Sequence, residues 1–193
     1  MDILHLAAPY RNVPVTFTLD LMYTVSASDR PRQIASAPQS SIGAPCPLIL
    51  AGENSLRLSY YLEEESLDAE WRKAAVRPGR PNWTDELCAL VTFDHAYAHM
   101  FGPPNDEAFS GHPLAARGLE PYSVFEIEGS SWLQQLVRMN SVHPYHRYEQ
   151  FSGFRHLVFS FHDTTFECIA KGYDIALWRG SPWSVLEDAA NEV

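Results

Sequence analysis

The chain has little cysteine, few cations and no long apolar run, and each of these shortages excludes a class of protein. Its three cysteines are widely spaced and form no CxxC pair, which argues against a secreted disulfide framework and a thiolate zinc site. No stretch of about 18 apolar residues is present, so no transmembrane helix is expected. Residues 1–5 lack a basic segment followed by an apolar run, which predicts no signal peptide and a cytoplasmic location.

Cations are outnumbered by carboxylates. Fourteen lysines and arginines stand against 24 aspartates and glutamates, and the formal net charge is -10. A field of this sign repels phosphates, so neither nucleic acid nor a membrane surface is expected as a partner. The same field favours a basic protein partner or a cationic ligand.

Several signature motifs are missing as well. The sequence has no GxSxG, no P-loop and no GxGxxG, which excludes the standard serine hydrolase, P-loop and dinucleotide-binding classes. No nucleotide cofactor is therefore expected. Other enzymes stay open, because active sites are often assembled from distant residues. With 46% hydrophobic and 12% aromatic residues, the sequence predicts one globular domain over residues 1–193.

Strand patterns dominate the chain. Alternating apolar and polar residues bounded by turn residues predict strands, and several of these pair as hairpins. The expected strands comprise residues 13–25, 47–51, 55–62, 87–101, 122–127, 155–161, 166–170 and 173–178. The fold class that follows is α+β, a predominantly antiparallel sheet built from hairpins and packed with a few helices, including a C-terminal one.

Three segments have helix signals. A short helix is expected around residues 66–75, and another is expected to start at the cap Ser131. Ser181 followed by Pro182 predicts the start of the C-terminal helix, with Trp183 among its inward side chains.

Residues 26–45 are rich in Ser, Pro and Ala, and we expect a flexible loop there, either a lid or a passive linker.

The tip of the last hairpin offers the first candidate site. If Thr164 and Thr165 form a two-residue loop, His162 lies opposite Glu167 on one face. A neighbouring carboxylate fixes the tautomer of an imidazole and raises its pKa, as a general base requires. His162 is therefore a candidate base, with Glu167 as its orienting partner and Asp163 as a further catalytic candidate. The alternative is an ordinary polar pair with Asp163 in an Asx-type turn.

His95 and His99 form the second candidate site, with Tyr97 between them as a candidate substrate-binding residue. Residues 87–101 fit a strand better than a helix, because Val-Thr-Phe disfavours a helix. Four-residue spacing places both imidazoles on one face in either case, where they could hold a divalent metal ion. The possible third ligands are Glu107, His112, His146 and His162. The alternative is a pair of hydrogen-bonded histidines on a half-buried face.

A stiff polar loop is the third candidate. Two consecutive prolines lower the entropy of residues 102–107, so the loop can hold Asn105, Asp106 and Glu107 in place to bind a substrate. His112 follows as a group that binds or protonates the substrate. An elaborate turn that caps a helix from Asp106 would have the same sequence.

Two stretches carry a resemblance. Phe-Gly-Pro-Pro-Asn-Asp-Glu-Ala at 101–108 with Gly-His-Pro-Leu at 111–114, and the stretch 155–168 with Phe-His-Asp-Thr-Thr-Phe-Glu-Cys, resemble a group of small uncharacterised bacterial proteins. The resemblance covers roughly residues 87–178. It implies no catalytic residue, fold or cofactor.

Two hypotheses for function follow. The first is an enzyme that performs general acid–base chemistry on a small molecule, by elimination, isomerisation, cyclisation or hydrolysis, with metal assistance as a variant. The second is an acidic binding or immunity-type protein that sequesters a basic protein partner without catalysis. Convergence of the hairpin tip with the double-proline loop would favour the first.

Overall fold

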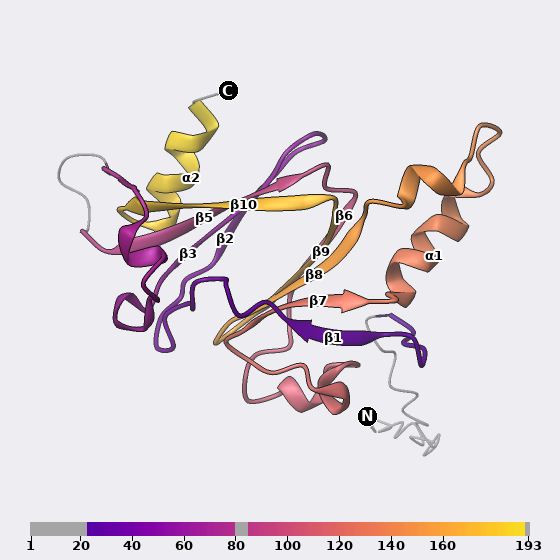
Figure 1. The fold of residues 1–193 in the computed structure, drawn as a ribbon, viewed down its shortest axis with the longest axis horizontal. Helices are drawn as coiled ribbons and strands as arrows, with labels where there is room; N and C mark the ends of the chain where they lie inside the picture. Colours follow the sequence, from indigo (N-terminus) through magenta and orange to yellow (C-terminus); the bar gives the residue numbers. More distant parts are fainter. Residues whose placement is uncertain (1–22, 80–84, 192–193) are drawn as a thin grey trace, which may run out of the picture.

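The computed structural model describes residues 23–79 and 85–191, which form two five-stranded sheets lying face to face (Figure 1). Within these residues there are ten strands and two α-helices, and all strand pairs but one are antiparallel. This arrangement confirms the expected α+β class. The strand expected at 13–25 falls largely outside the described residues.

The first sheet has the spatial order β1-β7-β8-β9-β6, with every neighbour antiparallel. Its strands are β1 (Arg30–Gln33), β6 (Ala98–Gly102), β7 (Val124–Glu128), β8 (Arg155–Ser160) and β9 (Thr165–Ala170). The hairpin of β8 and β9 is confirmed. It occupies the interior of the sheet, which explains why nearly all of its residues are buried.

The second sheet has the spatial order β2-β3-β5-β10-β4. Its strands are β2 (Leu48–Ala51), β3 (Leu56–Tyr61), β4 (Val76–Arg77), β5 (Leu87–Asp94) and β10 (Gly172–Arg179). The expected hairpin of β2 and β3 is confirmed, and its turn closes through a hydrogen bond from Gly52 N to Ser55 O of 2.8 Å.

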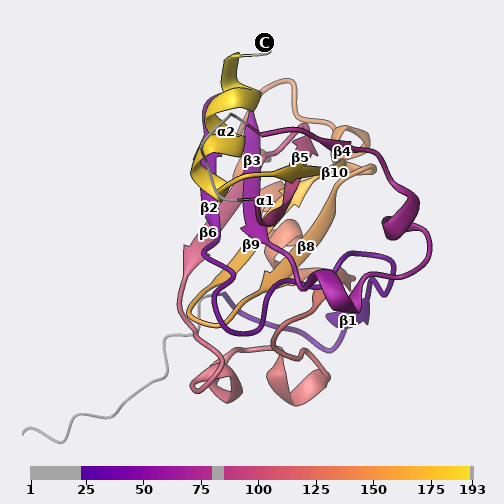
Figure 2. The ribbon, with the colours of Figure 1, turned by 90° about the vertical axis from the view of Figure 1, so that its left-hand side faces the viewer.

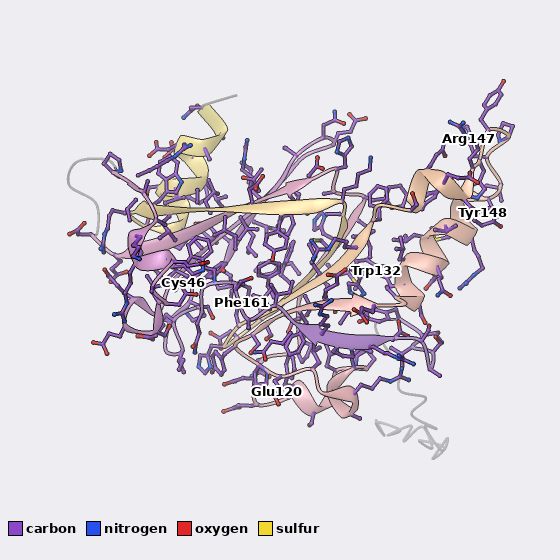
Figure 3. All side chains as sticks on the ribbon, viewed as in Figure 1. Cys46, Glu120, Trp132, Arg147, Tyr148 and Phe161 are labelled. Carbon is purple, nitrogen blue, oxygen red and sulfur yellow. The ribbon has the colours of Figure 1, made fainter. Side chains whose placement is uncertain are left out.

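Strand alternation divides the core into layers. Leu157, Phe159 and Phe161 face the space between the sheets, where they pack with apolar residues of β3 and β5. Phe161 is labelled at this position in Figure 3. Val158 and Ile169 point to the outer side of the first sheet. The segment between β6 and β7 covers that side, and Figures 1 and 2 both show it below β1.

Each helix begins at a serine cap. In α1 (Ser131–Asn140) the cap is Ser130, whose Oγ accepts from Leu133 N at 3.1 Å, so the expected cap was wrong by one residue. Asp29 Oδ1 is a second acceptor at this end of the helix, since it accepts from the N–H of Ser131 at 2.5 Å. These two acceptors fix the start of the helix, and α1 contacts β8.

The C-terminal helix α2 (Pro182–Asn191) begins where it was expected. Ser181 Oγ accepts from Ser184 N at 3.2 Å, and the helix packs against β2, β3 and β5. Leu186 is buried, but Trp183 is 64% exposed, so its expected inward position was wrong. Neither α1 nor α2 is long and apolar enough to span a bilayer.

Two further expectations need correction. Residues 26–45 are not uniformly irregular: they contain β1, and Ser40 forms a bridge with Leu62. Pairing with β7, far along the chain, supplies the hydrogen bonds that the local sequence does not predict. The helix expected at 66–75 is replaced by single 3₁₀ turns at Glu64–Ser66 and Trp71–Lys73, because so short a segment is marginal as a helix.

Candidate active site at the hairpin tip

The β8–β9 hairpin turns at His162 and Asp163. Ser160 pairs with Thr165, and Phe161 N donates to Thr164 O at 2.9 Å. The expected pairing of His162 with Glu167 was therefore wrong, since Glu167 lies opposite Val158. Asp accepts turn conformations readily, whereas the two β-branched threonines fit extended backbone better. The observed pairing register differs from the expected one by an even number of residues, so each side chain points to the expected face of the sheet.

The double-proline loop lies against this tip. Asp106 N donates to His162 O at 2.8 Å, and Thr165 Oγ1 donates to Pro104 O at 2.9 Å. The two segments that carry the predicted site residues are thus brought together by backbone as well as side-chain contacts. Asp163 is exposed at the outer end of the same turn.

Three side chains meet where the loop and the tip touch. Asp106 Oδ2 lies 3.0 Å from Nδ1 of His162 and 2.5 Å from the hydroxyl of Tyr122. The same hydroxyl is 2.9 Å from His162 Nδ1, and the two rings stack at a 19° interplanar angle. The carboxylate accepts from both partners. The partner of His162 is therefore a carboxylate from the loop, not Glu167 from its own hairpin.

This arrangement leaves one imidazole nitrogen available. With the proton on Nδ1 donated to Asp106, the lone pair of Nε2 is free, and it has no hydrogen-bond partner among the described residues. The side chain of His162 is 39% exposed. An imidazole held at one nitrogen by a carboxylate and open at the other is the geometry of a general base.

Electrostatics in the cluster reinforce this geometry. The hydrogen bond with Asp106 raises the pKa of His162 above its usual 6.5, against a smaller opposing effect of desolvation. The hydrogen bond from Tyr122 lowers the pKa of Asp106 below 3.8, and the same bond raises the pKa of Tyr122 to about 12. Near neutral pH, Asp106 is ionised and Tyr122 keeps its proton, so both hold their hydrogen-bonding roles.

The other loop residues have local roles or face solvent. Asn105 Oδ1 accepts from Ala108 N at 3.0 Å, and Asp106 Oδ1 accepts from Glu107 N at 2.7 Å. The side chain of Asn105 thus holds the turn, as the alternative interpretation of this loop required, although 3₁₀ turns and not a helix follow it. Glu107 is exposed beside the cluster.

A second polar cluster is buried on the outer side of the first sheet. Glu167 accepts from His112 Nε2 at 3.0 Å, from His156 Nε2 at 2.7 Å and from the Tyr23 hydroxyl at 3.0 Å. The side chains of Glu167 and both histidines are inaccessible to solvent. Three donors on one carboxylate compensate for its removal from water. Burial opposes ionisation, but the hydrogen bonds from His112 and His156 outweigh it and lower the pKa of Glu167 to about 2.

Backbone contacts fix the protons in this cluster. Leu114 N donates to Nδ1 of His112 at 3.1 Å, so the proton of that imidazole is on Nε2 and is donated to Glu167. Nε2 of His112 is therefore not free to coordinate a metal. Ser130 Oγ lies 3.0 Å from Nδ1 of His156 and completes a Ser–His–carboxylate chain. However, Ser130 is buried and already caps α1, which leaves no room for a substrate at its hydroxyl.

The two candidate metal ligands lie on one interrupted strand. β5 and β6 run in the same direction along β10 and β9, and His95 lies in the bulge between them with φ 48°, its Nδ1 2.5 Å from Asp94 Oδ1. His99 lies on β6 with its ring against Phe166, so the strand expected at 87–101 is present but is interrupted at residues 95–97. Among the described residues no group of three His, Cys, Asp or Glu side chains is placed to hold a metal ion.

Two other residues from that proposal also lie elsewhere. Tyr97 packs edge-on against Phe151 and near Phe154, away from the tip cluster. His146 follows α1 and its Nδ1 lies 2.9 Å from Asn140 Oδ1.

A cavity of about 360 Å³ opens between the sheets next to the tip. Its lining includes Tyr122, which also belongs to the tip cluster, but it includes neither His162 nor Asp106. The other aromatic side chains of the lining are Tyr60, Trp71, Phe159 and Phe161. Tyr122 thus belongs both to the tip cluster and to the lining of a hollow of ligand size.

Sequence reasoning missed Tyr122, His156 and Tyr23. Tyr122 has a left-handed φ of 56°, which is uncommon outside glycine and marks a constrained position, but no sequence pattern announces it. His156 could have been found, because strand alternation puts it on the same face as Val158, which is the residue opposite Glu167.

Comparison of the chain with protein-family models, with curated proteins and with solved structures finds no match.

Proposed function

We propose that the protein is an enzyme that transfers a proton to or from a small molecule, with His162 as the general base or acid. Asp106 orients the imidazole through Nδ1, and Tyr122 positions Asp106 through its own hydrogen bond. Glu167 and His112 take no part in the reaction, because solvent does not reach them. They support the strand and loop that carry His162 and Asp106.

The proposal rests on the different surroundings of the two ring nitrogens of His162. Nδ1 is engaged by a carboxylate, while Nε2 has no partner among the described residues on a side chain that solvent reaches. Elimination, isomerisation, cyclisation and hydrolysis all need such a group, and a positioned base typically contributes about 10² to 10⁴ in rate.

The test compares wild type with His162→Asn on a complex mixture of small molecules, with consumption followed by mass spectrometry. Asn keeps a donor for Asp106 but has no titratable nitrogen, so the fold is preserved while proton transfer is lost. His99→Asn is the matched control, since His99 is also an exposed imidazole on the same sheet.

The expected result is a compound that wild type and His99→Asn consume and His162→Asn does not. If no compound distinguishes wild type from His162→Asn, the proposed role is contradicted.

The alternative function is the acidic binding protein. It is supported by a hollow of about 580 Å³ lined by several carboxylates and by no described lysine or arginine. Those carboxylates are Glu63, Glu64, Glu65, Asp85 and Glu86. Arg179 pairs with Glu64 at 2.7 Å and so offsets part of this charge. A stoichiometric complex with a basic protein that dissociates with salt, in the absence of any consumed compound, would favour this alternative.

A further inference from the structure

We propose that the cavity between the sheets binds a small organic cation, such as a methylated ammonium compound, and this rests on the proposed function by naming its substrate class. The cavity lies next to the tip cluster and shares Tyr122 with it. A ligand in the cavity would therefore lie close to the reacting imidazole.

Aromatic rings form part of the lining. Trp71 and Tyr122 are half-buried, and these are the rings whose faces a ligand in the cavity can reach. Tyr60, Phe159 and Phe161 also line the cavity but are almost completely buried, so they form a rigid layer behind the two exposed rings. The faces of aromatic rings attract cations, and a preformed set of rings is a common way to hold a quaternary ammonium group.

The charge of the lining also favours a cation. Asp68 is the one charged residue among the described residues of the lining, and no lysine or arginine is present there. Its Oδ1 accepts from the backbone N–H groups of Glu70 and Trp71, both at 2.9 Å, which fixes the carboxylate next to the backbone of Trp71. The indole Nε1 of Trp71 donates to Ser36 O at 2.7 Å, so this ring is oriented too.

One polar group of the lining is unused. Ser40 is 6% exposed, and its buried hydroxyl has no hydrogen-bond partner among the described residues. A buried hydroxyl without a partner is unfavourable, so it marks a position where a bound molecule or water would be accommodated. A hydroxyl or carbonyl on the cation would satisfy it.

The experiment titrates the protein with choline and, separately, with 3,3-dimethylbutan-1-ol, which has the same shape without the charge. Dissociation constants come from calorimetry. The indole N–H signal of Trp71, assigned by its loss in Trp71→Leu, reports in the NMR spectrum whether binding occurs in this cavity. Choline is expected to bind about tenfold more tightly than the alcohol, with a shift of that signal.

Two variants and two controls locate the interaction. Asp68→Asn keeps the acceptor for Glu70 and Trp71 but removes the charge, and it should weaken choline binding several-fold without affecting the alcohol. Trp71→Leu should weaken choline binding more than alcohol binding. Asp174→Asn and Trp183→Leu make the same replacements at exposed positions outside the lining, and they should leave choline binding unchanged.

Equal affinity for choline and the alcohol, or choline binding that survives both Asp68→Asn and Trp71→Leu, would overturn the proposal. His162→Asn separates it from the proposed function, because His162 does not line the cavity and choline should bind this variant as it binds wild type. Cation binding without a catalytic effect of His162 would contradict only the proposed function. A catalytic effect of His162 without cation selectivity would contradict only the present inference.

Discussion

Asp106 Oδ2 lies 3.0 Å from Nδ1 of His162, although the two residues are 56 positions apart in the sequence. A backbone bond from Asp106 N to His162 O runs beside this contact, so the carboxylate and the imidazole are held by both side chains and main chain. Such double attachment limits the rotation of the ring and gives the imidazole one tautomer and one orientation.

The first prediction concerns the titration of His162. Asp106→Asn removes the charge whose hydrogen bond is the largest cause of the raised pKa, so the pKa of His162 should fall towards 6.5. NMR titration of the imidazole signals measures this directly. His99→Asn serves as the control and should leave the His162 titration unchanged. A His162 pKa that is the same in wild type and Asp106→Asn would contradict the pairing.

The same pair predicts a window of pH in which it stabilises the fold. The raised pKa of His162 contributes stability that is fully present below pH 6.5 and is lost as the pH rises through the folded-state pKa. The lowered pKa of Asp106 contributes stability that is present above pH 3.8 and is lost as the pH falls through its folded-state value. Urea unfolding of wild type and Asp106→Asn should therefore differ most between these two values.

A third prediction concerns Tyr122. Tyr122→Phe removes the hydrogen bond that is the largest cause of the lowered Asp106 pKa, so the pKa of Asp106 should rise towards 3.8. NMR of the Asp106 carboxyl carbon measures this shift. Because the phenyl ring can still stack on His162, unfolding by urea should change by only about 1 kcal/mol, the usual net value of one hydrogen bond. An unchanged Asp106 pKa would show that the short contact with Tyr122 is not made in solution.

The buried cluster gives a fourth prediction. Glu167→Gln replaces a carboxylate that accepts from three donors by an amide with a single oxygen, so at least one buried donor loses its acceptor. The unfolding free energy should fall by roughly 3 kcal/mol, the upper range for a lost hydrogen bond to a charged group. Glu149→Gln, at an exposed carboxylate, is the control and should change it by less than about 0.5 kcal/mol.

Acid should act through the same carboxylate. The pKa of Glu167 is lowered from 4.5 to about 2, so its contribution is present above pH 4.5 and is lost as the pH falls through about 2. Integrated over this interval, the loss amounts to about 3 kcal/mol. The stability of wild type should fall in this range, and Glu167→Gln should lack that part of the slope. Parallel acid profiles for the two proteins would contradict the ionised state of Glu167.

The turn before α1 provides a fifth prediction. Gly129 has φ 67°, and a Cβ there would lie 2.4 Å from Ser28 O. Gly129→Ala should therefore destabilise the protein by about 2 kcal/mol or more, measured by urea unfolding. Gly111→Ala is the control, since a Cβ at Gly111 meets nothing within 4 Å. Equal stability of the two variants would show that the turn can relax.

Local patterns were enough to predict most of the strands. The β8–β9 hairpin and the start of α2 follow from alternation, turn residues and a serine cap, all of which act over a few residues. β1 was missed because its stabilising partner, β7, lies far away in the chain and its own residues are polar. The bulge at His95 was missed because the alternation of side chains continues through residues 91–101 and no Gly or Pro marks a break.

The candidate site was predicted in part. The loop and the hairpin tip were expected to converge, and Asp106 and His162 do meet. The partner of His162 was predicted wrongly. The turn lies at His162 and Asp163 instead of the expected two threonines, which places Glu167 away from the tip. Tyr122 comes from a third segment, and only the folded chain shows that its hydroxyl reaches both groups.

The central claim is that His162 transfers the proton and that Asp106 orients it. The most direct measurement is the rate of consumption of the compound found by mass spectrometry, in wild type, His162→Asn and Asp106→Asn across pH 4 to 9. The rate in wild type should follow one ionisation with a pKa above 6.5, Asp106→Asn should move that inflection lower, and His162→Asn should lose about 10²-fold or more. A His162→Asn rate within twofold of wild type, or an inflection that Asp106→Asn leaves in place, would contradict the claim.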